Sequence, residues 1–245
     1  MNYHWNWGIF FEQIKYGDET YLSWLISGLG WTVAVSLASW VIALLLGFAI
    51  GTVRTTPRTW LVRLGNAYVE LFRNIPLLVQ MFLWFFVVPE FLPRNLSLWV
   101  KQAMPAKEFV TATVCLGLFT SARIAEQVRA GIQSLPRGQR MAGLAMGLTL
   151  PQTYRYVLLP MAFRIIIPPL TSEFMNVFKN SSVAFAIGVL ELTFQARQMQ
   201  EDSEQGIETY LAVTVLYFVC AFIANRMMAF IEKRSRVPGY IAAAK

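Results

Sequence analysis

The segment GQRMAGLAMGLTLPQTYRYVLLP, residues 138–160, lies between two long apolar runs and carries polar residues at its edges. Its first part, roughly Gln139–Met146, predicts a short helix because apolar residues recur at the i, i+3, i+4, i+7 spacing of one helix face. These residues are Met141, Leu144, Ala145 and Leu148. Gly147 follows where a helix end favours the left-handed conformation, which glycine adopts without a side-chain clash.

A second short helix is expected directly after this glycine. Thr149 and Gln152 form a capping-box pattern, and Pro151 loses no needed hydrogen bond in a first turn. We expect Leu159-Pro160 to end the unit, because proline cannot donate a helical hydrogen bond. The apolar face of this helix comprises Tyr154, Val157 and Leu158. An amphipathic helix pair inside an otherwise membrane-like chain needs a partner for its outer surface.

The composition of the chain indicates a membrane protein. Of its 245 residues, 56% are hydrophobic and 14% are charged, whereas soluble domains carry about 25% charged residues. The net charge of +7 is compatible in principle with nucleic-acid binding. However, the basic residues lie in the gaps between apolar runs, where anionic lipid and the positive-inside bias account for them. We therefore expect membrane lipid, and no nucleic acid, among the partners.

Residues suited to catalysis or metal binding are few. Cys115 and Cys220 both fall inside apolar runs and are interpreted as packing residues. His4 is the one histidine, and no nucleophile–base pair is apparent. We therefore predict no catalytic residue and no metal site, and the chain is not expected to be an enzyme.

Five membrane spans are expected, since a bilayer-crossing helix needs about 20 apolar residues. They are Leu25–Val53, Leu64–Val88, Phe109–Arg129, Phe163–Leu190 and Glu208–Ile231. Residues 25–232 would thus form the membrane domain, with a cytoplasmic tail at 233–245 and a short interfacial helix within Leu92–Met104. Residues 1–24 are interpreted as an aromatic-rich periplasmic segment at the membrane interface, or alternatively as a partly ordered tail. Their aromatic residues include Trp5, Trp7, Tyr16, Tyr21 and Trp24.

The charges between the spans predict the orientation. One side carries Arg54, Arg58, Arg63, Arg137, Arg140, Arg155, Lys233, Arg234, Arg236 and Lys245. The other carries Lys15, Arg94, Lys101, Lys107 and Arg197, with an acidic last loop of Glu191, Glu201, Asp202, Glu204 and Glu208. The positive-inside rule therefore predicts an N-terminus outside the cytoplasm and a cytoplasmic C-terminus. It also predicts that segment 138–160 faces the cytoplasm.

This segment resembles the cytoplasmic coupling loop, EAA-x3-G-x9-I-x-LP, of permease subunits of binding-protein-dependent ABC importers. Five residues match the pattern at the right spacings: Ala142, Gly147, Val157, Leu159 and Pro160. Met141 replaces the acidic residue and Gly143 replaces the second alanine. In that family the loop docks into a groove of the ATPase subunit. The resemblance therefore implies these ATPase-coupling residues: Met141, Ala142, Gly143, Gly147, Thr149, Tyr154 and Pro160.

Three further segments resemble permeases of polar amino-acid importers, and most of all glutamate/aspartate importers. They are ELFRNIPLLVQMF (70–82), GLFTSARIAEQVRAGIQSLPRGQ (117–139) and TSEFMNVFKNSSVAFAIGVLEL (171–192). The resemblance implies an all-α integral membrane fold of the type I importer permeases, in the bacterial inner membrane. It also implies an ABC ATPase dimer, a second permease subunit, homologous or identical, and a periplasmic substrate-binding protein. ATP and Mg are expected on the ATPase subunits and no cofactor on this chain, which lacks a G-x-x-x-x-G-K-[ST] loop.

Charges within the spans need a partner or an aqueous cavity. Glu70 and Arg73, at i and i+3, are expected to neutralise each other, with a helix break at Pro76. Arg123, Glu126 and Arg129 repeat at three-residue spacing and predict an internal ladder with one positive charge in excess. That charge suits either a substrate carboxylate or an acid of a partner subunit.

The fourth predicted span carries a polar stripe. Glu173, Asn176 and Asn180 share one helical face, with Lys179 adjacent, and Pro168-Pro169 predicts a break upstream. A lipid-facing stripe would be costly, so these residues either line a translocation path or fix the packing of the permease pair. The candidates for the substrate path are thus Arg123, Glu126, Glu173, Asn176, Lys179 and Asn180.

The sequence therefore favours an ABC permease subunit that imports a polar amino acid, driven by a separate ATPase. A secondary transporter or channel without an ATPase is the alternative, although no inverted repeat is detectable. The preference for glutamate and aspartate follows from the resemblance, because the charges in the spans suit acidic and basic substrates equally.

Overall fold

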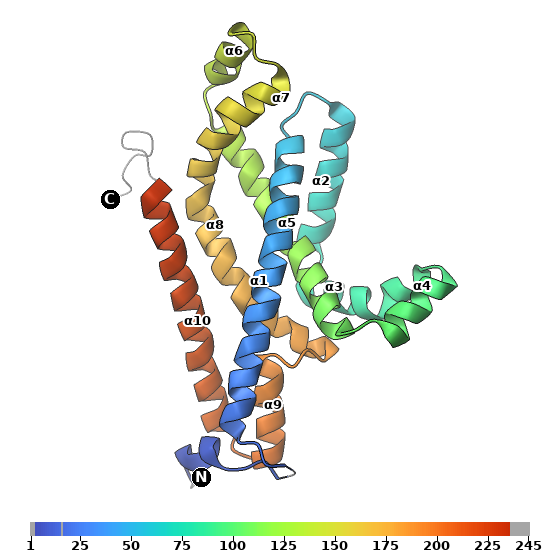
Figure 1. Ribbon diagram of the computed structural model, residues 1–245, viewed down its shortest axis with the longest axis vertical. Coiled ribbons are helices and arrows are strands. Elements are labelled where there is room, and N and C mark those ends of the chain that lie inside the picture. The colour runs from blue at the N-terminus through green and yellow to red at the C-terminus, as the bar shows by residue number, and fades with distance from the viewer. Residues whose placement is uncertain (1–2, 16, 236–245) are drawn as a thin grey trace. The chain divides into compact units, whose positions relative to one another are not determined.

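The computed structural model describes residues 3–15 and 17–235, and helices dominate this part of the chain. Its α-helices are α1 (Tyr21–Val53), α2 (Thr59–Asn74), α3 (Leu77–Phe82), α4 (Arg94–Leu98), α5 (Lys107–Gln133), α6 (Arg137–Ala145), α7 (Leu150–Thr153), α8 (Leu159–Ser181), α9 (Leu192–Ser203) and α10 (Gly206–Ser235) (Figure 1). The described residues contain no strand, only an isolated bridge between Gln13 and Thr20. Of the residues that the sequence analysis singles out, Tyr16, Arg236 and Lys245 lie outside the described ranges.

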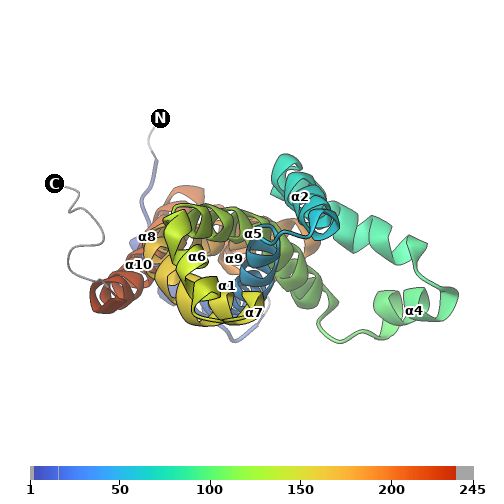
Figure 2. The same ribbon diagram turned by 90° about the horizontal axis from the view of Figure 1, so that it is seen from above.

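Short 3₁₀ and π turns connect or extend these helices. They are η1 (Trp7–Phe11), η2 (Leu83–Val87), η3 (Val88–Phe91), η4 (Trp99–Ala103), η5 (Tyr154–Leu158) and η6 (Ser182–Ile187). The helical segment predicted within Leu92–Met104 corresponds to α4 and η4. Figure 2 shows α4 turning back beside the preceding turn η3.

Four described helices are long and apolar enough to cross a membrane: Tyr21–Val53, Lys107–Gln133, Leu150–Ile187 and Gly206–Arg234. A fifth candidate is the broken pair Thr59–Asn74 and Leu77–Phe91. These correspond in order to the five spans that the sequence predicts.

The break in the second span lies at the predicted proline. Helix α2 ends at Asn74, and Ile75 is extended, with φ −98° and ψ 130°. A residue that precedes proline disfavours the helical region for steric reasons. Pro76 then caps α3, so the predicted break is confirmed.

Two other proline predictions are wrong. Helix α8 continues through Pro168 and Pro169 without interruption. The fixed φ of proline lies in the helical range, so the helix can continue even though proline removes a hydrogen bond and crowds the carbonyl of residue i−4. Leu159-Pro160 does not end the preceding helix either. The backbone N–H of Leu159 bonds the carbonyl of Tyr154 in a π turn, and this wider turn gives the next residue, Pro160, room to continue into α8.

The described chain divides into two compact units. The first comprises the residues up to Trp40, Pro76–Gly117 and Asn176–Ile223, and the second comprises Val41–Ile75, Leu118–Met175 and the residues from Ala224 onward.

The first unit has a core that includes the N-terminal segment. Its buried residues are Ile9, Tyr21, Leu25, Leu192, Ala196, Met199 and Val213. The backbone N–H of Asn6 donates to Glu208 at 2.8 Å, which holds the N-terminal segment against the start of α10. Trp5 and Trp7 stack on each other and stay more than half exposed.

The second unit depends on close approach of α1 and α5, which lie side by side (Figure 1). A Cβ atom at Gly47 would lie 2.6 Å from Ile124, and one at Gly51 would lie 2.7 Å from the carbonyl oxygen of Ala125. Tyr68 of α2 bonds the Ser121 hydroxyl of α5 at 2.7 Å. Small residues and one tyrosine thus bring three helices together around the charged residues described next.

Candidate functional site

Arg54 follows the last turn of α1 and is almost fully buried. Its side chain is 7% exposed, and its Nη1 lies 2.8 Å from Oε2 of Glu126 on α5. Its Nε also donates to Oδ1 of Asn66 on α2 at 2.8 Å. A buried charge is tolerated when it is paired and hydrogen-bonded, and Arg54 meets both conditions.

Glu126 is shared by three arginines. Besides Arg54, it accepts hydrogen bonds from Arg129, one turn further along α5, with 3.2 Å between Arg129 Nε and Glu126 Oε1. Nη1 of Arg73 on α2 lies 3.7 Å from Glu126 Oε2. One carboxylate therefore links α1, α2 and α5.

A second ion pair joins α5 to α8. Nε of Arg123 lies 2.9 Å from Oε2 of Glu173, and Gln127 Nε2 donates to the other oxygen of Glu173 at 3.0 Å. The Glu173 side chain is 7% exposed, whereas that of Arg123 is 40% exposed. The buried acid thus has one cation and one amide as partners.

The predicted pairings are only partly observed. In the predicted ladder the Glu126–Arg129 contact forms, but Arg123 pairs with Glu173 instead of Glu126. The predicted Glu70–Arg73 pair is wrong, because Arg73 lies near Glu126 and Glu70 is exposed. In both cases the arginine lies beside the less exposed carboxylate, where an unpaired charge would cost more.

A cavity of about 360 Å³ opens onto this cluster. It is lined by Arg73, Phe119, Arg123, Glu126, Gln127 and Glu173. Oε1 of Gln127 is buried and has no hydrogen-bond partner among the described residues. The ion pairs around the cavity join four arginines to two glutamates, so positive charge is in excess.

The other predicted path residues lie elsewhere. Asn176, Lys179 and Asn180 belong to the first compact unit, whereas the charged cluster belongs to the second. Lys179 is exposed and the two asparagines are half-buried. Sequence reasoning also missed Arg54 and Gln127 as members of the cluster. The sequence analysis assigned Arg54 to a loop between spans. The spacing of residues along the chain does not show that it pairs with Glu126, which is 72 residues away.

The predicted helix pair of segment 138–160 is present. Helix α6 ends before Gly147, which has φ +82°, and α7 follows directly (Figures 1 and 2). The capping box forms, with the backbone N–H of Thr149 donating to Gln152 Oε1 at 2.8 Å. The glycine turn and the cap are thus confirmed.

The structure explains why glycine occupies position 143, where the family pattern has alanine. It is buried where α6 contacts α7, and a Cβ atom there would lie 2.8 Å from Cγ2 of Thr153. An alanine at this position would require the Thr153 side chain or the adjoining backbone to shift.

Tyr154 anchors the helix pair to the turn that follows α1. Its hydroxyl donates to the carbonyl oxygen of Thr55 at 2.7 Å, and the ring is buried. The outer face of the pair is exposed: Met141 is 68% and Met146 is 82% accessible.

A buried acid outside the membrane spans has a structural role. Glu191 caps α9 and accepts hydrogen bonds from the backbone of Phe194 at 2.9 Å and from Tyr217 at 2.6 Å. Burial raises the pKa of the Glu191 carboxyl, and these hydrogen bonds oppose the rise. In the same unit, a hydrogen bond from Tyr21 lowers the pKa of Asp202.

The family model for binding-protein-dependent transport system inner membrane components matches residues 43–237. The chain belongs to this family. The predicted family, the all-α permease fold and the transport function are therefore confirmed, as is the inner membrane as its location.

Relatives resemble the chain over most of its length. The glutamate/aspartate import permease protein GltJ of Escherichia coli K12 is 48% identical over 98% of both chains. The glutamate/aspartate import permease protein GltK of E. coli O6:H1 is 31% identical over 87% of this chain and 94% of its own. A crystal structure of an amino acid ABC transporter with histidines has a TM-score of 0.75 and 29% identity, covering 87% of this chain and 95% of that one.

Replacement of Glu126 by glutamine should destabilise the chain strongly. It leaves the nearly buried Arg54 without its counter-charge, and Glu126 itself is 28% exposed. We expect a loss of about 2–3 kcal/mol, below the value for a fully buried pair. The measurement is thermal unfolding of the purified protein in detergent.

Glu201→Gln is the matched control. It breaks the Arg197–Glu201 pair, whose side chains are both 62% exposed, so we expect less than about 0.5 kcal/mol. Equal losses in the two variants would show that Glu126 has no special structural role.

Proposed function

We propose that this chain is a permease subunit of an ABC importer that carries glutamate and aspartate into the cell. The observation that carries this proposal is the 48% identity with GltJ, a glutamate/aspartate import permease protein, over 98% of both chains. ATP hydrolysis on a separate subunit drives the import. The chain acts by rigid-body alternation between outward- and inward-open states.

The proposed partner subunits follow from the same assignment as an ABC importer permease. An ABC ATPase dimer holds ATP and Mg, a periplasmic binding protein delivers the substrate, and this chain itself binds no cofactor. The second permease subunit is a different, GltK-like chain. Two different permease proteins, GltJ and GltK, carry the same import designation, and both are related to this chain.

In the proposed orientation, segment 138–160 and the C-terminus lie in the cytoplasm and the N-terminus lies in the periplasm. The distribution of loop charges supports it. The exposed outer face of α6 then meets the ATPase. Tyr154, bonded to Thr55, transmits the movement of the ATPase to the end of α1.

The charged cluster forms part of the substrate path. Arg73 and Arg123 line a cavity of about 360 Å³, which suits a small ligand. They offer guanidinium groups to the carboxylates of an acidic amino acid. Gln127 Oε1, buried without a partner among the described residues, offers an acceptor to the ammonium group. Glu126 and Glu173 hold the arginines in place, while Asn176, Lys179 and Asn180 serve the path further along α8.

Uptake measurements test the function directly. In a strain that lacks this chain, plasmid-borne expression should restore uptake of labelled glutamate and aspartate more than that of glutamine, histidine or methionine. A tagged chain should also retain an ATPase subunit in mild detergent. Restored uptake without a retained ATPase would support a secondary transporter or channel instead.

Removal of the Arg123–Glu173 pair separates packing from substrate contact. Arg123→Gln alone leaves Glu173 buried and unpaired, so it should lower both stability and uptake. The double variant Arg123→Gln/Glu173→Gln removes both charges and should recover the melting temperature. Its glutamate uptake should stay about tenfold below wild type, because a hydrogen bond to a charged group contributes about 1.5–3 kcal/mol.

Arg123→Lys is the matched control, since it keeps the charge. It should retain more glutamate uptake than the double variant. Uptake by the double variant within about twofold of wild type would limit Arg123 to a packing role.

Gly147→Val tests the helix pair as the coupling element. Gly147 has φ +82° with open space around a Cβ position, so the variant suffers from backbone strain and not from a clash. A left-handed conformation costs a side-chain-bearing residue about 1–2 kcal/mol, and a β-branched residue more. We expect normal membrane insertion and continued ATP hydrolysis, but much less uptake per ATP in vesicles.

Gly138→Val is its control, because Gly138 lies in α6 with open space and an ordinary helical backbone. This variant should remain coupled. Unchanged uptake per ATP in Gly147→Val would contradict a coupling role for the turn.

A further inference from the structure

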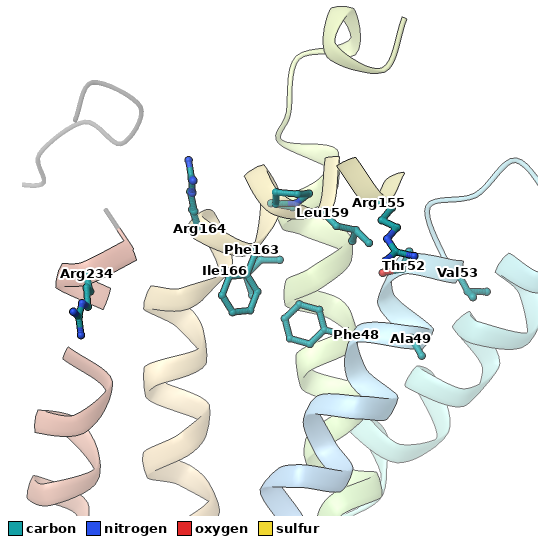
Figure 3. Close-up of a pocket in the computed structure, with 12 residues that line it drawn as sticks. Phe48, Ala49, Thr52, Val53, Arg155, Leu159, Phe163, Arg164, Ile166 and Arg234 are labelled. Carbon is teal, nitrogen blue, oxygen red and sulfur yellow. The ribbon is translucent and has the colours of Figure 1, made fainter. Parts of the chain in front are cut away.

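A large cavity lies where the end of α1 meets the start of α8, in the second compact unit (Figure 3). Its volume is about 1010 Å³. Figure 3 shows the rings of Phe48 and Phe163 near each other along it, and their centroids are 5.7 Å apart. Further aliphatic residues of both helices complete an apolar wall.

Three arginines line this cavity, and the lining contains no acidic residue. Arg155 points toward Thr52 of α1, while Arg164 and Arg234 lie on α8 and α10 (Figure 3). All three are exposed, and within the described ranges none of them forms an ion pair. Their nearest ring contacts are loose, at 5.7 Å for Arg155 over Tyr156 and 5.8 Å for Arg234 over Phe230.

The cavity lies at the ends of membrane spans. The first candidate span ends at Val53 and the last ends at Arg234, and both residues line the cavity. Arg155 lies in the first turns of the span that begins at Leu150. Span ends lie at the depth of lipid headgroups, where basic residues attract anionic lipid.

We infer that this cavity binds one anionic phospholipid. Arg155, Arg164 and Arg234 supply the positive charge that attracts its headgroup, and an acyl chain lies against Phe48 and Phe163. The volume and the apolar wall fit a lipid better than a free phosphate, which would leave the wall facing water. This inference is independent of which amino acid is carried.

Charge argues against an occupant from the chain itself. The segment RVPGYIAAAK, residues 236–245, follows α10 and carries two basic and no acidic side chains. It does not complement a cavity lined by three arginines. An anionic lipid complements both the charge and the apolar wall.

Lipid retention by the intact complex tests this site. The tagged full-length chain, with its copurified subunits, is delipidated in detergent and incubated with dioleoyl phosphatidylglycerol or dioleoyl phosphatidylcholine. Bound lipid is then counted by native mass spectrometry. Wild type should retain one phosphatidylglycerol in preference to phosphatidylcholine. The variant R155Q/R164Q/R234Q should bind it at least about tenfold more weakly, given the attraction of each arginine to anionic lipid.

The control variant R58Q/R63Q/K233Q removes the same charge from exposed residues that do not line the cavity. It should bind like wild type. Ala49→Trp fills the cavity and leaves every arginine in place, so it should also lose the lipid. Its melting temperature reports whether it folds.

Several outcomes would overturn the inference. Equal loss in the control would mean that net charge alone attracts the lipid, and displacement by millimolar inorganic phosphate would mean a site for the phosphate group only. Retention by Ala49→Trp or by the triple arginine variant would place the lipid elsewhere. A subunit crosslinked into the cavity in place of lipid would assign this surface to a protein partner.

Discussion

The pairing of buried charges holds the helices of the second compact unit together. Arg54 is 7% exposed and Glu173 equally so, and each has an oppositely charged partner within 3 Å on another helix. A buried charge that lacks an oppositely charged partner is strongly destabilising. The pairs therefore hold α1, α5 and α8 together. The side chains of Arg73 and Arg123 line a cavity and stay 48% and 40% exposed.

The same unit connects this cluster to the helix pair that follows α5. Tyr154 donates to the carbonyl of Thr55, and Thr55 is the immediate neighbour of Arg54. Arg54 in turn bonds Glu126. A displacement of the helix pair thus reaches the charged cluster through one hydrogen bond, one peptide bond and one ion pair.

Local features of this fold follow directly from the sequence. The span order, the break at Pro76, the left-handed Gly147 and the cap at Thr149 each depend on a few adjacent residues, and each was predictable. The partners of Arg123 and Arg73 were not, because an arginine reaches carboxylates on its own helix and on neighbouring helices, and burial decides between them. Pro160 was misread for a related reason. Its effect depends on the π turn formed by Tyr154–Leu158, which the local sequence pattern does not predict.

The end of α1 is where these features converge. The hydroxyl of Thr55, beside the anchor of Tyr154, donates to the carbonyl of Thr52 at 2.8 Å, and Thr52 lines the arginine-lined cavity. The residues from Thr52 to Thr55 thus contact the cavity, the Arg54–Glu126 pair and the helix pair α6–α7. If the helix pair couples to an ATPase as proposed, an occupant of that cavity would restrict the turn between the helix pair and the charged cluster. Membrane composition would then influence coupling through packing, without any contact with the transported amino acid.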